Sequence, residues 1–404
     1  MSAGVLGLEP LLSYAYAPRL GIYRRFLHVE REAMTLPEGS VREELLRTLR
    51  RAKAELDLPG LGLGQGLLEE LLSRCDPSGL ALACAWASRG QKPFNLIATD
   101  FDETLRFRRE TEAEVPPETV GILRALLDRF PQLVLVANTA RSLEHARGLL
   151  VQLLGAGRAN TSRVMVIYEG GAGIFIPGRG RHSRIPLYRE LPQAVLGVLA
   201  QVRARLPAAC LVGMDCPCWD YSLQADEFNL SLKPNYPAGS PEAVRIAHRL
   251  VEVLLDTLGE VVAQAEGLPL PEARRAARKQ LLGEAPGDPP PPHVPLLEAL
   301  RLLHYPGDAA VLTAQGLDKG KGLERGIEAL GLKEPWVLAL GDGGQDLPMF
   351  EAVARHRWGL PACPEGAHPE VVSWVRAQGG ILYPPGRADR VLQAAYALGL
   401  CGQA

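Results

Sequence analysis

Short apolar runs alternate with amphipathic segments from about residue 95 onward. Largely apolar runs of four or five residues occupy 95–99, 133–137, 164–168 and 337–340. Between the first two runs, residues 120–130 repeat apolar side chains at helical spacing. Strands that are apolar throughout and alternate with helices are typical of a parallel sheet covered on both faces. The pattern therefore predicts an α/β fold for this part of the chain.

Polar residues follow three of these four runs immediately. Asp100 comes after the first run, Asn138 and Thr139 after the second, and Glu169 after the third. Ligands of parallel α/β sheets bind outside the carboxyl ends of the strands. We therefore expect a functional site to assemble at one edge of the predicted sheet.

Two segments depart from this alternation. Residues 1–92 are mainly helical in character, since 41–56 carry leucines at three- to four-residue spacing and the glycines of 60–66 then break the pattern. Within 175–312, a partly alternating, strand-like stretch precedes a helical one at 241–258. We interpret the first segment as an N-terminal helical extension and the second as a domain inserted into the α/β core.

The resulting division of the chain has four parts. We predict an N-terminal extension at 1–92, a first part of the core at 93–174, an inserted domain at 175–312, and a second part of the core at 313–404.

The amino-acid composition of the chain limits the classes of molecule that it is expected to bind. Lys and Arg number 44 and Asp and Glu number 46 among 404 residues, a formal net charge of −2, so no basic footprint for nucleic acid or an anionic membrane is expected. No apolar run approaches the roughly 18 residues that a membrane span requires.

The seven cysteines lack the spacing of a disulfide framework and favour a reducing compartment. We expect a cytoplasmic protein, with organellar targeting left open.

Two pairs of aspartates stand at predicted strand ends. Asp100 and Asp102 could supply a nucleophile and a general acid/base, provided that a cation offsets their repulsion. Taken alone, they could equally be the carboxylates of a capped turn. After another strand, the glycines around Asp342 and Asp346 permit a tight turn that points both carboxylates to a common place. Oxygen ligands of this kind suit Mg²⁺.

Three further residues suit the binding of a phosphoryl group. Thr139 stands at a predicted strand end, Arg141 follows two residues later, and Lys319 opens a predicted helix. Hydroxyl and cationic groups can hold phosphoryl oxygens and offset developing charge. Each residue alone could be a helix cap or a solvated side chain. Their order along the chain favours a phosphoryl site.

The order Asp-x-Asp-x-Thr, Thr, Lys-Gly and Gly-Asp-Gly-x-x-Asp resembles the haloacid dehalogenase superfamily of phosphatases and mutases, over about residues 94–400. The insert between the second and third motifs resembles the branch with an α/β cap of the second type (C2). That branch includes Cof-like phosphatases, sucrose-phosphate, trehalose-phosphate and mannosyl-3-phosphoglycerate phosphatases, and the eukaryotic phosphomannomutases. The resemblance implies a Rossmann-like core with an inserted C2 cap.

The resemblance also implies roles for the motif residues. Asp100 would be the nucleophile that forms an aspartyl-phosphate, and Asp102 would protonate the leaving oxygen and then activate water. Thr139, Lys319 and Arg141 would bind the phosphoryl group. Mg²⁺ would be bound by four aspartates, one of them through its backbone carbonyl: Asp100, Asp102 (carbonyl), Asp342 and Asp346.

The sequence departs from the family pattern at three positions. Glu103 stands where many relatives have Gly, Ala140 where the branch usually has Gly, and Gln345 where Asn is usual. None of these changes removes a charged catalytic group, so they bear on loop geometry and substrate fit.

Specificity is expected from the cap. The candidates combine aromatic, charged and amide side chains that could stack on a sugar ring and bind its hydroxyls, although outward-facing polar residues of a cap sheet would look the same. They are Arg181, Trp219, Tyr221, Glu227, Asn229 and Lys233.

The sequence thus predicts a Mg²⁺-dependent phosphatase that acts on a small phosphorylated metabolite, either a sugar phosphate or a phosphoglycerate-type ester. Two alternatives stay open: a phosphohexomutase of the same fold, and a non-catalytic sensor of a phosphorylated ligand that works through the N-terminal helices. Those helices could also form a homodimer contact or bind another partner.

Overall fold

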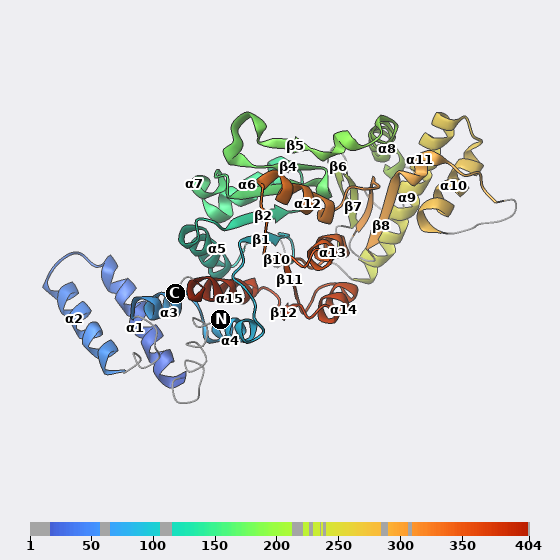
Figure 1. The fold of residues 1–404 in the computed structure, drawn as a ribbon. Coiled ribbons are helices and arrows are strands. Elements are labelled where there is room, and N and C mark those ends of the chain that lie inside the picture. Colours follow the sequence, from blue (N-terminus) through green and yellow to red (C-terminus); the bar gives the residue numbers. More distant parts are fainter. Residues whose placement is uncertain are drawn as a thin grey trace.

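The computed structural model contains two β-sheets and helices that cover them (Figure 1). It describes residues 17–56, 65–105, 115–211, 221–225, 229–234, 236, 240–283, 290–305 and 309–402.

The larger sheet has eight strands in the order β12-β11-β10-β1-β2-β3-β4-β5. Neighbours from β12 to β3 are parallel, and β4 and β5 extend the sheet antiparallel. The strands are β1 (Leu96–Thr99), β2 (Val134–Asn138), β3 (Val164–Tyr168), β4 (Gly173–Phe175), β5 (Arg184–Pro186), β10 (Val337–Leu340), β11 (Gly359–Pro364) and β12 (Ile381–Tyr383). The α/β fold expected from the four apolar runs is confirmed, and those runs form β1, β2, β3 and β10.

Helices cover both faces of this sheet, which explains why its central strands are apolar throughout. Ile97 of β1 packs into one buried cluster with Leu126 and Tyr396, whereas its neighbours Leu96 and Ala98 pack into a second cluster on the opposite face. The covering helices are α5 (Pro117–Arg129), α6 (Leu143–Leu154), α7 (Ala156–Ala159), α12 (Lys319–Leu330), α13 (Leu347–Arg355), α14 (Pro369–Ala377) and α15 (Ala388–Cys401).

The smaller sheet is antiparallel, with four strands in the order β6-β7-β9-β8. Its elements lie between β5 and α12 in the chain: α8 (Gln193–Leu211), β6 (Tyr221–Ala225), β7 (Asn229–Pro234), α9 (Pro241–Glu266), α10 (Leu270–Leu282), α11 (Pro295–Glu298), β8 (Leu300–Tyr305) and β9 (Ala309–Ala314). Helix α9 packs one apolar face against β7, β8 and β9. The division of the chain at residues 92, 174 and 312 stays a prediction. Two observations bear on its boundaries: β4 and β5, which extend past residue 174, pair in the larger sheet, and β9 of the smaller sheet runs past residue 312 to Ala314.

The N-terminal region is helical, as predicted, and lies at the end of the molecule away from α9 and α10 (Figure 1). It contains α1 (Ala17–Thr35), α2 (Ser40–Glu55), α3 (Gln65–Arg74) and α4 (Pro77–Ser88). The buried Lys53 of α2 binds Glu30 of α1 at 2.7 Å and Glu69 of α3 at 3.4 Å, so one ammonium group links three helices. Among the described residues, no helix is both long and apolar enough to cross a membrane.

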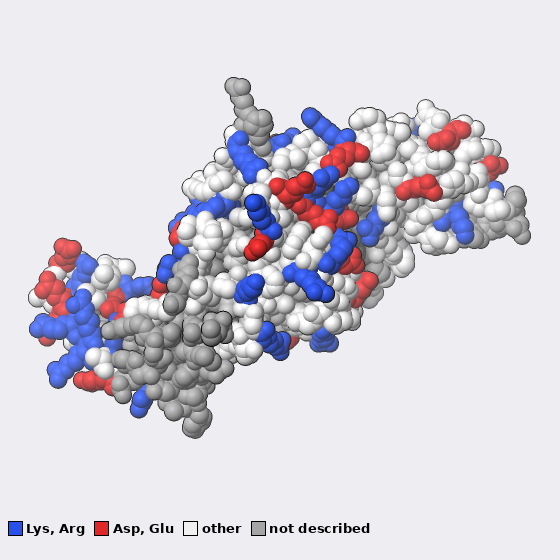
Figure 2. Space-filling view, in the orientation of Figure 1, with Lys and Arg blue, Asp and Glu red and all other residues white. Residues whose placement is uncertain are grey.

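Charged side chains of both signs are interspersed over the described part of the face in Figure 2. This distribution agrees with the net charge of −2 for the whole sequence.

A polar junction fixes α4 to the C-terminal helix α15. Asp76 caps α4 by accepting a hydrogen bond from the Gly79 N–H at 2.9 Å, and Arg387 at the start of α15 contacts its other oxygen at 3.2 Å. The backbone N–H of Asp76 donates to Gln393 Oε1 of α15 at 2.7 Å. Burial opposes ionisation, but the hydrogen bonds from Gly79 and Ser78 and the Arg387 guanidinium hold the pKa of Asp76 below its usual value.

We predict that Asp76→Ala lowers the free energy of local opening of α4 by about 1 kcal/mol at pH 7, because it removes both the cap and the charge. Asp76→Asn keeps a good capping side chain and should lose less. The pKa of Asp76 is lower in the folded state than in the unfolded state. Ionised Asp76 therefore stabilises the fold fully at pH values above its unfolded-state pKa of roughly 4. This stabilisation is lost as the pH falls through the folded-state pKa.

Amide hydrogen exchange of residues 77–88 checks this prediction when each variant is compared with wild type at pH 7 and at pH 3. The difference between wild type and Asp76→Asn should shrink at the lower pH. Equal protection of all three proteins at pH 7 would contradict the assignment of Asp76 as the anchor of α4.

Candidate active site

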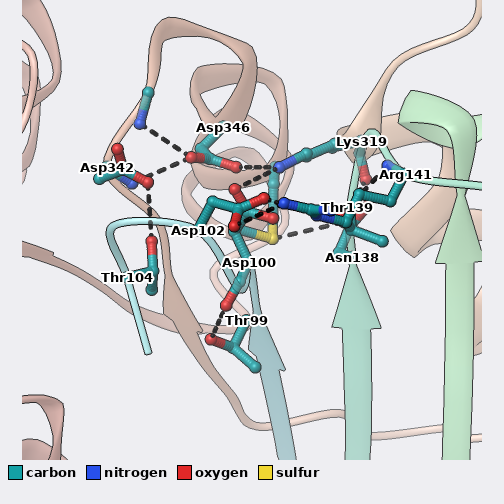
Figure 3. A network of polar contacts seen from close by, with 12 residues as sticks. Thr99, Asp100, Asp102, Thr104, Asn138, Thr139, Arg141, Lys319, Asp342 and Asp346 are labelled. Carbon is teal, nitrogen blue, oxygen red and sulfur yellow. Dashed lines mark hydrogen bonds and ion pairs between the residues drawn. The ribbon is translucent and has the colours of Figure 1, made fainter. Parts of the chain in front are cut away.

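The candidate site lies at the ends of the adjacent strands β10, β1 and β2. Figure 3 shows the polar side chains that gather there. Thr99, the last residue of β1, is in register with Leu340 of β10 and Ala137 of β2. The residues that follow these strands therefore emerge at one edge of the sheet. They include Asp100 after β1 and Thr139 after β2.

Helix α12 brings Lys319 to the same place. Asp318 caps this helix by accepting a hydrogen bond from the Lys321 N–H at 2.7 Å, which sets Lys319 in the first turn. The Lys319 Nζ lies 3.1 Å from Asp100 Oδ2 and 2.6 Å from Asp346 Oδ1. All three side chains are at least 95% buried, so the ion pairs are almost completely removed from water.

A tight turn after β10 supplies Asp342 and Asp346. Asp346 Oδ2 accepts hydrogen bonds from the backbone N–H groups of Asp342 and Gly343, both at 2.9 Å. A Cβ atom on Gly341 would lie 2.5 Å from Asp346 Cγ, so this close approach requires glycine. The turn thereby directs both aspartates toward the end of β1, as their spacing predicts.

The carboxylates of Asp100, Asp342 and Asp346 form an acidic cluster in which one oxygen of each lies within 4.8 Å of the others. Burial raises the pKa of Asp100 to about 6; Asp346 and Asp102 add to the rise and Lys319 opposes it. Burial, followed by the charges of Asp346 and Asp100, raises the pKa of Asp342 well above its usual value. Burial by itself lowers the pKa of Lys319, but the two carboxylates more than reverse this and raise it.

This cluster fits a divalent cation. Three carboxylates face a single ammonium group, so the site carries an excess of negative charge in surroundings that penalise it. Closely grouped carboxylate oxygens are the ligands that Mg²⁺ takes in proteins. The Asp102 carboxylate is not part of this group of three, and its expected contribution through the backbone carbonyl stays a prediction.

The Asp102 side chain is instead held by Arg141 through two hydrogen bonds, Nε to Oδ2 at 2.7 Å and Nη2 to Oδ1 at 2.9 Å. Arg141 Nη1 also lies 2.6 Å from His145 Nε2. The buried Thr139 accepts a hydrogen bond from the Arg141 N–H at 3.2 Å, so the phosphoryl-binding candidates of the second motif share one short loop.

Three residues of the site were given no role by the sequence analysis. Asn138 is fully buried and donates a hydrogen bond from Nδ2 to the backbone carbonyl of Lys319 at 2.9 Å. Its position at the end of an apolar strand could have indicated a role in the site. Thr104 donates to Asp342 at 2.9 Å, and the fixed threonine of the first motif could have indicated a contact. Tyr383 donates to the Thr104 carbonyl at 3.4 Å and carries no signal in the sequence.

The six specificity candidates fall into two groups. Trp219 and Glu227 lie outside the described residues. The other four lie in described elements, but their side chains are outside the description: Arg181, Tyr221, Asn229 and Lys233.

Comparison with known proteins supports the resemblance found in the motifs. Residues 297–371, which contain Lys319, Asp342 and Asp346, match the haloacid dehalogenase-like hydrolase family. The chain is 39% identical over 83 residues to a phosphoglycolate phosphatase of Methanothrix thermoacetophila, which covers 20% of this chain and 35% of that protein. The chain therefore spans about a third of the length of this curated relative.

One solved structure shares the fold over most of the chain. The C-terminal domain of trehalose-6-phosphate phosphatase from C. albicans matches with a TM-score of 0.51 and 15% identity, over 81% of this chain and 98% of that domain. The sucrose-phosphatase of Synechocystis sp. PCC6803 matches with a TM-score of 0.42 and 16% identity, over 76% of this chain and 99% of that one. The matched segment therefore makes residues 297–371 similar to the haloacid dehalogenase-like hydrolases, and the chain shares its fold with the trehalose-6-phosphate phosphatase domain.

Proposed function

We propose that the chain is a Mg²⁺-dependent phosphatase that hydrolyses a small phosphorylated metabolite through an aspartyl-phosphate intermediate. The observation that carries this proposal is the buried Lys319, which contacts Asp100 and Asp346 at the strand ends beside Asp342. A nucleophilic carboxylate, a fixed cation and a metal-binding carboxylate pair within one cluster are the groups that phosphoryl transfer needs.

In the proposed reaction, an oxygen of Asp100 attacks the substrate phosphorus, and the bond from phosphorus to the ester oxygen breaks. Asp102 gives a proton to the departing oxygen. In the second step Asp102 takes a proton from water, the water oxygen attacks the same phosphorus, and Asp100 is released with inorganic phosphate. Lys319 and Thr139 hold the phosphoryl oxygens in both steps.

Mg²⁺ bound by Asp100, Asp342 and Asp346 would offset the negative charge of the phosphoryl oxygens. The excess of three carboxylates over one ammonium group supports the presence of such a cation. Asp102 would contribute its backbone carbonyl.

The ion pair between Arg141 and Asp102 affects when Asp102 can act as an acid in the proposed reaction. A carboxylate with both oxygens bound to a guanidinium group has no proton to donate, so Asp102 must separate from Arg141 and take up a proton from solvent before it acts as an acid. A phosphoryl group that reaches Thr139 brings a second anion next to Arg141. In this proposal Arg141 turns to the phosphoryl oxygens and thereby releases Asp102.

A sugar phosphate or a phosphoglycerate-type ester is the proposed substrate class. A phosphoglycolate phosphatase is among the sequence relatives, and a trehalose-6-phosphate phosphatase domain shares the fold. We propose that the smaller sheet and its helices form the cap that recognises the rest of the substrate. Five of the six candidates come from that part of the chain, and Arg181 comes from the segment between β4 and β5 of the larger sheet.

We predict that Asp100→Asn abolishes phosphate release, with a fall in kcat of at least about 1,000-fold, because an amide oxygen is a poor nucleophile. The assay is release of inorganic phosphate from a panel of sugar phosphates and phosphoglycerate esters in the presence of Mg²⁺. Asp128→Asn is the matched control, since Asp128 is a surface carboxylate paired with Arg158.

Activity of the Asp100 variant close to that of wild type would refute the aspartyl-phosphate route. Interconversion of phosphate isomers without release of phosphate by wild type would identify a mutase instead. A folded wild-type protein that turns over no phosphoester would favour the sensor.

We predict that a chelator stops phosphate release and that added Mg²⁺ restores it. Asp342→Asn should weaken Mg²⁺ binding by about 10-fold or more, because it removes one of the three charged ligands. Calorimetric titration of each protein with Mg²⁺ in the absence of substrate measures this directly. Wild-type activity that survives exhaustive chelation would rule out the metal requirement.

We predict that Arg141→Gln lowers kcat/KM by about 10- to 100-fold, since it removes a charged, bidentate group from the site. Arg141→Lys should recover only part of this loss, because an ammonium group cannot reproduce the fork of a guanidinium. Steady-state kinetics on the best substrate separates kcat from KM. The control is Arg158→Gln, which removes the bidentate contact to Asp128 on the surface. Unchanged kinetics in Arg141→Gln would exclude Arg141 from the site.

A further inference from the structure

The loop after β1 makes a strained turn at Glu103. Its φ angle is 56°, in the left-handed region that a side chain disfavours by roughly 1 kcal/mol. This is also the position where many relatives have Gly. The turn sends the chain back toward the sheet, and the Leu105 N–H then donates to the Phe101 carbonyl at 3.1 Å.

Thr104, the next residue, is held on two sides. It is 1% exposed, and its Oγ1 donates to Asp342 Oδ1 at 2.9 Å (Figure 3). Its backbone carbonyl accepts a hydrogen bond at 3.4 Å from the hydroxyl of Tyr383, a buried side chain of β12. The Thr104 hydroxyl therefore reaches the turn after β10 from a fixed position.

The partners of the three clustered carboxylates differ. Asp100 and Asp346 each contact the Lys319 ammonium, whereas Asp342 has its side-chain contact with the Thr104 hydroxyl. Asp342 lies within 4.8 Å of the other two negative groups, so repulsion favours rotation of its side chain away from them. A hydrogen bond from a rigid donor opposes that rotation and keeps the carboxylate within the cluster.

We infer that Thr104 is a positioning residue for the metal site, in which its hydroxyl holds the Asp342 carboxylate in the orientation that binds a divalent cation. This inference rests on the proposed Mg²⁺ site. Thr104 itself contacts neither the phosphoryl group nor the cation; its role is to orient a ligand before the cation arrives.

The test compares Thr104→Val, which keeps the shape of the side chain and removes the hydroxyl, with Thr104→Ser, which keeps the hydroxyl. Calorimetric titration of the full-length proteins with Mg²⁺, without substrate, should show a Kd raised by about 10- to 100-fold in Thr104→Val and within about threefold of wild type in Thr104→Ser. At saturating Mg²⁺, kcat for phosphate release by Thr104→Val should return to near the wild-type value.

Thr119→Val is the matched control. Thr119 lies in α5, is fully buried, and its Oγ1 has no hydrogen-bond partner among the described residues. The same loss of a buried hydroxyl should therefore leave Mg²⁺ binding unchanged. Thermal unfolding without Mg²⁺ verifies that each variant is folded, and Thr104→Ala replaces Thr104→Val if the latter does not fold.

The outcomes separate this inference from the function on which it rests. Wild-type Mg²⁺ affinity in Thr104→Val, or in Thr104→Ala where it replaces Thr104→Val, overturns the positioning role while the metal site stands. An equal loss of affinity in Thr104→Ser overturns it as well, because the hydroxyl would then not be the group that matters. Absence of Mg²⁺ binding in wild type overturns the metal site and this role together.

Discussion

The buried contact of Lys319 with Asp100 and Asp346 is the interaction around which the site is organised. An ammonium group and two carboxylates removed from water are strongly destabilising unless each finds an opposite charge at hydrogen-bond distance, as they do here at 3.1 and 2.6 Å. This requirement ties three distant parts of the sequence together: the end of β1, the first turn of α12 and the turn after β10. The remaining excess of negative charge is what suits the same cluster to a divalent cation.

The sheet makes this convergence possible. Because β10, β1 and β2 are adjacent and parallel, their carboxyl ends share one edge, and short polar loops suffice to bring the side chains together. Asn138 donates a hydrogen bond to the Lys319 carbonyl, and this contact holds the start of α12 against the end of β2. In the proposed function, this core supplies the phosphoryl-transfer chemistry, and recognition of a particular substrate is left to elements outside it.

Much of this arrangement could be predicted from the sequence because it depends on local patterns. Strands buried on both faces are apolar throughout, which revealed β1, β2, β3 and β10, and the polar residues after them marked the edge of the sheet. Strands such as β11, with Pro361 in its middle, and the three-residue β12 lack that pattern. Contacts between side chains could not be predicted in the same way. The pairing of Asp102 with Arg141, and of Thr104 with Asp342, depends on how separate loops pack after the sheet has formed.

The order of the elements ties the smaller sheet to the chemistry. Only residues 315–318 connect the last strand of that sheet, β9, to Lys319 at the start of α12. Four residues span at most about 14 Å even when fully extended, so the start of α12 lies close to the end of β9. The covalent connection therefore keeps Lys319 within a short distance of the smaller sheet, which is the proposed cap.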